Sequence, residues 1–266
     1  MKRMMKKVLI LTTLSLGSMV AVAETPQALE GVTKSNLELL NTAGQQRMLS
    51  QRIAKNYFYI GKGVSVSKAK KQLKASLRAF ENNLNRIKNA VKDEEVQNMI
   101  AFIEMSKEDF YTITSEKYNL DNGALALDLS ESMLEGSQFV VDAIKDMSKA
   151  QASSMVALAG KQRMLSQRIA KYYISYQSGI KDKNSIDQMN QAVKEFSQTH
   201  KTLMANKANT AEINKELQKI DRLWKIVYKF YLNIEKGGLP VIVYNTTDEI
   251  MKRMDKITKL YTEIYK

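Results

Sequence analysis

The sequence predicts an all-α protein made of two tandem four-helix up-down bundles. The chain holds only 2 prolines and 11 glycines in 266 residues, and long stretches repeat apolar residues at helical spacing. A further observation predicts the duplication: Gln46–Lys55 recurs letter for letter as Gln162–Lys171, with an Ala-Gly pair at the same distance upstream of each. Two buried tracts that needed only to stay apolar would not have kept the same polar residues, so the motif indicates more than packing.

The first bundle is predicted within residues 24–148. Its first helix spans about 29–60, carries the first motif and stops at Gly61-Lys62-Gly63, because glycine commonly ends helices. A second helix spans about 67–91. Acids at 93–95 favour the start of a third, which ends before a break at 119–123, and a fourth begins near Ala124.

The second bundle, within residues 149–266, repeats this plan. Its motif helix ends near Ser178, and further helices cover about 185–205, 210–235 and 241–264. The sequence Gly237-Gly238-Leu239-Pro240 breaks the chain where Asn122-Gly123 does in the first copy.

The junction between the copies has two interpretations. Residues 140–175 contain no strong helix breaker, which favours a long shared helix and bundles stacked end to end. Arg47 and Arg163 would then lie far apart, and each would need a partner chain, as in a homodimer. If the Ser-rich stretch near 148–154 turns instead, the copies lie side by side and the two arginines can share one site.

Composition excludes several classes of function. The chain has no cysteine, so disulfides and thiolate chemistry are excluded. A single histidine, His200, leaves little material for metal clusters or His-based triads. Ser50 and Ser166 have no neighbouring base. We therefore expect a protein that is not an enzyme and needs no metal or cofactor, and we expect His200 to be exposed on a helix.

The net charge of +13 permits attraction to anions or anionic surfaces. Lysine and arginine are interspersed with acids along the predicted helix faces, and no motif that reads a nucleic-acid groove occurs. We therefore interpret most of the charge as solvated helix surface and expect no nucleic-acid partner.

Residues 1–23 are typical of a signal peptide. A basic start precedes the apolar segment Val8–Val20, and Ala21-Val22-Ala23 resembles a cleavage site. We expect a periplasmic or secreted mature chain, the alternative being an uncleaved membrane anchor.

The motif has a definite helical geometry. Leu49, Ile53 and Tyr57 form an apolar stripe, while Gly44 and Arg47 lie one turn apart on another. Glycine inside a helix costs about 0.5–1 kcal/mol relative to alanine, so its presence indicates close approach of a backbone or ligand. Guanidinium is well suited to a planar oxyanion because it presents a fixed fork of donors.

The motif resembles the signature of the PilJ-type sensor domain of type IV pili methyl-accepting transducers, which is similar to the nitrate-sensing domain of NarX-type kinases. The resemblance covers Asn41-x-Ala43-Gly44-x-Gln46 through Arg52 and its second copy. It implies an anion held between two motif helices, one from each subunit, by Arg47 or Arg163 with backbone contact at Gly44 or Gly160. The second copy departs from the pattern with Ala157 in place of Asn41.

From this resemblance we expect a sensor that binds a small oxyanion such as nitrate or nitrite. The chain would pass a signal to a membrane receptor, sensor kinase or pilus-associated protein. The alternative is a structural or interaction module whose arginines bridge to carboxylates. Arg52 and Arg168 are expected to pair with acids, with a supporting anion contact as the alternative. The secondary candidates for the site are Asn41, Ser50, Gln51, Arg52, Ser166, Gln167 and Arg168.

Overall fold

The computed structural model describes residues 26–147 and 150–265. All regular structure within these ranges is helical, which confirms the predicted all-α class. The first half contains α1 (Pro26–Gly61), α2 (Val66–Ala90), α3 (Glu94–Ser115) and α4 (Leu120–Asp146). The second contains α5 (Ala150–Gln177), α6 (Lys183–Met204), α7 (Ala211–Tyr231), the short 3₁₀ helix η1 (Ile234–Lys236) and α8 (Pro240–Ile264). The predicted signal peptide lies outside the described residues.

Side-chain caps explain where several helices begin. Asp93 accepts a hydrogen bond from the backbone N–H of Val96 at the start of α3, and Asn119, Asp182 and Thr210 cap α4, α6 and α7 in the same way. Each cap satisfies one of the backbone donors that a helix start leaves unpaired. The cap at Asn119 starts α4 a turn earlier than the sequence analysis predicts.

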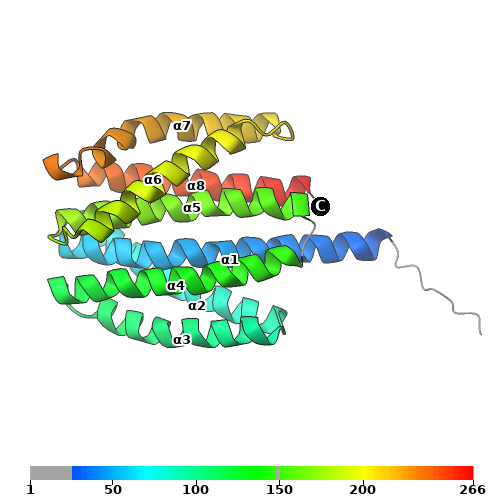
Figure 1. Ribbon diagram of the computed structural model, residues 1–266, viewed down its shortest axis with the longest axis horizontal. Coiled ribbons are helices and arrows are strands. Elements are labelled where there is room, and N and C mark those ends of the chain that lie inside the picture. Colours follow the sequence, from blue (N-terminus) through cyan, green and yellow to red (C-terminus); the bar gives the residue numbers. More distant parts are fainter. Residues whose placement is uncertain (1–25, 148–149, 266) are drawn as a thin grey trace, which may run out of the picture.

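The two bundles lie side by side, so the predicted long shared helix and end-to-end stacking are wrong. α4 ends at Asp146, and α5 starts at Ala150 and runs back in the opposite direction. Figure 1 shows α1 and α5 adjacent at the centre, with their N-termini at the same end. They pack more extensively than any other helix pair in the described chain. The preference for a continuous helix failed because packing of one motif helix on the other outweighed the weak local signal.

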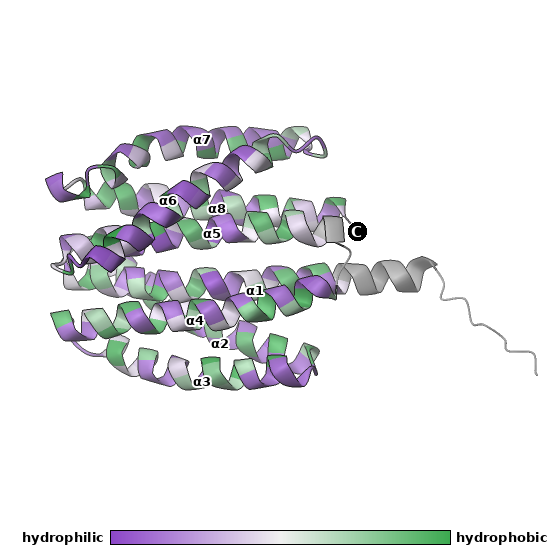
Figure 2. Cartoon of the chain, viewed as in Figure 1, coloured by the Kyte–Doolittle hydropathy of each residue, from purple (hydrophilic) through white to green (hydrophobic). Residues whose placement is uncertain are grey.

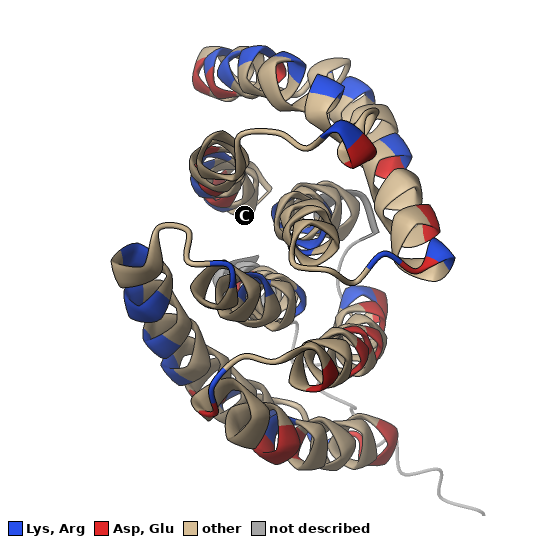
Figure 3. Ribbon diagram, turned by 90° about the vertical axis from the view of Figure 1, so that its left-hand side faces the viewer, with Lys and Arg blue, Asp and Glu red and all other residues tan. Residues whose placement is uncertain are grey.

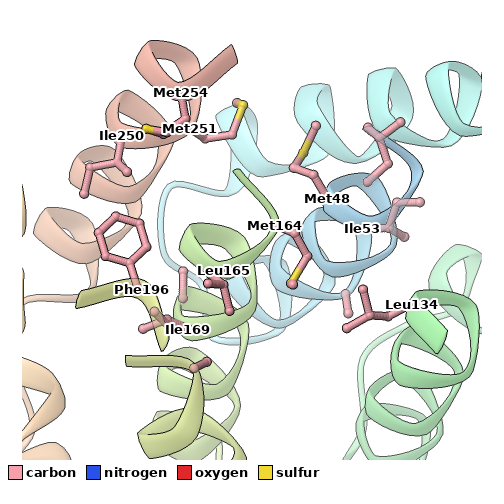
Figure 4. Packing of buried hydrophobic residues seen from close by; sticks show 14 of the residues in the cluster. Met48, Ile53, Leu134, Met164, Leu165, Ile169, Phe196, Ile250, Met251 and Met254 are labelled. Carbon is pink, nitrogen blue, oxygen red and sulfur yellow. The ribbon is translucent and has the colours of Figure 1, made fainter. Parts of the chain in front are cut away.

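The hydrophobic core extends from one bundle into the other through this central contact. Seen end-on, α1, α4, α5 and α8 form the inner group, and the α2–α3 and α6–α7 pairs lie outside them (Figure 3). Hydrophobic and hydrophilic residues are interspersed along the helices (Figure 2), and the apolar side chains of the core are buried, as amphipathic helices require. Figure 4 shows the motif methionines Met48 and Met164 among the buried apolar side chains.

His200 is 3 % exposed, so the predicted exposed position is wrong: its ring stacks on Phe196, with the centroids 6.0 Å apart.

Among the described helices, none combines the length and apolar character needed to cross a membrane.

Candidate functional site

Arg47 of α1 and Arg163 of α5 converge where the two motif helices approach each other most closely. A Cβ atom added to Gly44 would lie 4.0 Å from the Cα of Gly160, 3.6 Å from Nη2 of Arg47 and 3.2 Å from Nη2 of Arg163. A Cβ on Gly160 would lie 3.4 Å and 3.3 Å from the same two nitrogens. The two glycines therefore make room for a neighbouring backbone and for both guanidinium groups at once, which explains their place inside helices.

Neutral acceptors hold Arg47. Its Nη1 donates to Oε1 of Gln138 in α4 at 2.6 Å, and its Nη2 donates to the carbonyl of Ala157 in α5 at 3.4 Å. The amide nitrogen of Gln138 in turn donates to Asp142 at 2.9 Å. Asp142 thus reaches Arg47 through an intervening amide and acts on it by its charge, and Arg47 has no direct ion pair within the described residues.

Arg163 makes the equivalent contacts but meets a carboxylate. Its Nη1 forms an ion pair with Asp255 of α8 at 2.5 Å, and its Nη2 donates to the carbonyl of Asn41 in α1 at 3.3 Å. Since Asn41 and Ala157 both contribute a backbone carbonyl, the departure between the motif copies leaves this contact intact. The two halves differ instead at Gln138 and Asp255.

Both guanidinium groups are buried. Arg47 is 2 % exposed and Arg163 0 %, and the Nε atom of each is buried with no hydrogen-bond partner among the described residues. Burial, followed by the charge of Arg163, lowers the pKa of Arg47 to about 10. Burial also lowers the pKa of Arg163, against the opposing effect of Asp255. Because guanidinium stays protonated in proteins, both groups are cations, each with an unused Nε donor.

A cavity of about 310 Å³ reaches Arg47 between α4 and α5. Its charged lining consists of Arg47, Lys145 and Lys161 with the single acid Asp142. The balance is cationic, and of the arginine pair only Arg47 lines this cavity.

The other polar motif residues bind backbone carbonyls. Gln46 donates to Phe80 at 3.0 Å, and Gln162 donates to Phe196 at 2.9 Å. The second glutamine and the serine of each copy likewise donate to carbonyls in α1, α4, α5 and α8: Ser50, Gln51, Ser166 and Gln167. These matched bonds show that the halves are structural equivalents, and they give the four residues a packing role.

Two buried ion pairs cross between the bundles, and the sequence analysis missed them. Lys55 of α1 contacts Asp248 of α8 at 2.6 Å, and Lys171 of α5 contacts Glu131 of α4 at 2.5 Å. Both lysine side chains are 0 % exposed. The sequence offered one signal, the lysine at the same position at the end of each motif. It did not show which acids these lysines would meet, because the packing of α4 and α8 against the motif helices could not be predicted.

The outer motif arginines behave differently from Arg47 and Arg163. Arg168 donates to both carboxylate oxygens of Glu131 and to Gln188, so the predicted acid partner of Arg168 is confirmed. Arg52 acts on Asp248 through its charge, helping to lower the pKa of that carboxyl. Neither arginine lies at the glycine contact.

The protein is thus a helical module of two bundles. Its motif helices pack in parallel at the centre and bury the two arginines between them. The sequence model of the PilJ family, described as the type IV pili methyl-accepting chemotaxis transducer N-terminal region, matches residues 33–98 and 147–236. The matched segments include both motifs and cover more than half of the chain. The protein therefore belongs to this family of chemotaxis sensory regions. No curated protein and no solved structure gives a significant match.

Proposed function

We propose that this chain is an extracytoplasmic sensor that binds a small planar oxyanion, nitrate or nitrite first, at Arg47 and Arg163. The observation that carries the proposal is the convergence of the two buried guanidinium groups at the Gly44–Gly160 contact. The resemblance of the motif to nitrate-sensing domains supports the choice of ligand.

Electrostatics support an anion at this position. Both Nη2 atoms lie within 3.6 Å of one point beside Gly44, so they are at most about 7 Å apart. Two unit charges at that distance repel by roughly 2 kcal/mol at an effective dielectric constant of 20. Of these two arginines, Arg163 alone has a carboxylate in direct contact within the described part of the chain. A bound anion would offset the repulsion and accept hydrogen bonds from the two unused Nε donors.

A signal follows if the anion favours one packing of α1 on α5 over another, because a ligand shifts an equilibrium only through its differential affinity. We propose that the bundles, with their boundary near residue 148, act as the two halves of one receptor and pass this change to a membrane-bound chemotaxis or pilus partner. The signal-like character of residues 1–23 supports a location outside the cytoplasm.

Calorimetric titration with nitrate, nitrite and chloride tests the proposal. We expect one site per chain for nitrate, with at least about tenfold weaker binding in Arg47→Ala and Arg163→Ala. Arg86→Ala, which removes an exposed arginine, is the matched control and should bind normally. An absence of heat with every anion would contradict the proposal.

The ion pair between Arg163 and Asp255 favours a second candidate, a helical interaction module whose arginines only join the bundles. Asp255→Asn separates the two functions. In a sensor the change removes a competing carboxylate and tightens anion binding. In an interaction module it lowers the free energy of unfolding and creates no anion binding.

A further inference from the structure

A second cavity, larger than the one at Arg47, lies away from the arginine pair. It measures about 720 Å³ and is bounded by α4, α5 and the start of α6. It therefore lies between the first bundle and the second, on the flank of the central helices. Neither Arg47 nor Arg163 lines it, although the secondary candidate Arg168 does.

The lining is acidic although the whole chain is basic. Asp128, Glu131, Glu135 and Asp182 contribute carboxyl groups, against the single cation Arg168. Figure 3 shows acidic residues gathered along one inner helix on this flank. Glu131 is engaged by Arg168 and Lys171, and Asp182 caps α6. Within the described residues, no hydrogen bond or ion pair is seen for the carboxyl groups of Asp128 and Glu135.

At the equivalent place in the other half, an ammonium group of the protein itself lies beside the acid. Lys68 of α2 donates to Oδ1 of Asn245 at 2.7 Å, lies 3.5 Å from Oδ2 of Asp248, and sits 4.6 Å from the ring centroid of Tyr244. The protein thus already holds a primary ammonium between an acid, an amide oxygen and an aromatic ring at this position.

The residues around the cavity correspond to those around Lys68, except that the lysine is missing. Glu131 is the equivalent of Asp248, because each pairs with the motif lysine of the other bundle. Asp128 precedes Glu131 by three residues, as Asn245 precedes Asp248. Asn184 stands four residues before Gln188.

Lys68 has the same place before Gln72. Both glutamines belong to their ion-pair clusters, since Gln72 donates to Asp248 and Gln188 accepts from Arg168. In the half with the cavity, the shorter, neutral Asn184 replaces Lys68, so the internal ammonium is missing. Asp128 takes the position of Asn245, which accepts from Lys68 in the other half, and adds a carboxyl group there.

We propose that this cavity binds a small organic ammonium compound, with an alkyl diamine as the best match. One ammonium would lie at Asp128 and Glu131, in the place that Lys68 fills in the other half, and beside the ring of Tyr172. The second would reach Glu135, one turn further along α4. The four carboxyl groups outnumber the two cations Arg168 and Lys171 by two, which favours two positive charges over one. This site does not depend on the proposed oxyanion site.

Calorimetric titration of the full chain with 1,4-diaminobutane at low ionic strength tests the proposal, with 1,4-butanediol as the uncharged probe. We expect saturable binding of the diamine, none of the diol, and weakening with added salt. Asp128→Asn and Glu135→Gln should each weaken binding about tenfold. Asp121→Asn, an exposed acid on α4 outside the lining, should not change it.

The sharpest comparison exchanges the residues at the two equivalent positions, Asn184 and Lys68. Asn184→Lys should supply the internal ammonium, abolish diamine binding and raise the thermal midpoint. Lys68→Asn should remove the internal ammonium beside Asp248 and add a second, weaker diamine site there. Arg47→Ala should leave diamine binding unchanged, which separates this site from the oxyanion site. Diamine binding that persists in Asn184→Lys, or no binding by the unmodified chain, would overturn the proposal.

Discussion

Arg47 and Arg163 carry the same motif letter, yet the protein surrounds them differently. A neutral amide accepts from Arg47, whereas a carboxylate accepts from Arg163. Sequence alone predicted the glycine and arginine of each copy as a unit, because their spacing places them one helical turn apart. It could not predict Gln138 and Asp255, which belong to distant helices and carry no recognisable motif.

Gly44→Ala tests whether the glycine serves the guanidinium groups. The new methyl group would meet Nη2 of Arg163 at 3.2 Å, so that flexible group must move, while alanine gains about 1 kcal/mol of helix propensity. We expect a stability near or above that of the unmodified protein and clearly weaker nitrate binding. Chemical denaturation and calorimetry measure the two quantities. Unfolding of the variant would show instead that the glycine serves backbone packing.

His200 predicts a pH dependence of stability. Burial lowers its pKa from 6.5, and Asp221 opposes the shift. The folded state therefore binds its proton at lower pH than the unfolded state does. Stability is unaffected above the unfolded pKa and falls as pH drops below about 6.5 towards the folded pKa.

The variant His200→Leu takes the residue found at the equivalent place of the first bundle, Leu84, which is buried. Urea denaturation between pH 7 and pH 5 should show a smaller loss of stability in the variant, because His200 is the only histidine of the chain. An equal loss in both proteins would contradict this account.

At the scale of elements, periodicity and turn residues predicted all eight long helices of the described ranges, mostly to within a few residues. The junction was predicted wrongly because Ser148–Ser154 contains neither proline nor glycine. The chain turns there because α1 packs against α5. That contact is tertiary and leaves no local pattern in the sequence.

The crossed ion pairs join elements of different bundles and predict a large effect of one substitution. Asp248→Asn would leave Lys55 buried without its acid, and removal of one partner of a buried pair costs about 3–5 kcal/mol. Denaturant unfolding should show this loss. Glu104→Gln breaks the exposed pair with Lys88 and should change little. Equal effects of the two substitutions would contradict a joining role for Lys55 and Asp248.

These pairs also predict acid sensitivity. Although burial opposes ionisation, Lys55 and Arg52 lower the pKa of Asp248 to about 2. This contribution to stability is present above the unfolded pKa of 3.8 and is lost as pH falls towards 2.

At the scale of the whole molecule, the chain places two copies of one motif helix in parallel contact. The resemblance predicted such a contact between subunits, and the side-by-side alternative placed it within one chain. The structure has this second arrangement. The halves have diverged on their flanks: Lys68 lies beside Asn245 and Asp248 on one side, and an acidic cavity lies on the other.

The most direct test of the central proposal observes the arginine Nε–H groups by NMR during a nitrate titration. Both Nε atoms are buried without a partner, so their signals report new hydrogen bonds with little interference from solvent. If one anion lies between Arg47 and Arg163, the two Nε–H signals should shift together and saturate at one nitrate per chain. Signals that stay unchanged at saturating nitrate, with Arg163 still paired to Asp255, would contradict it.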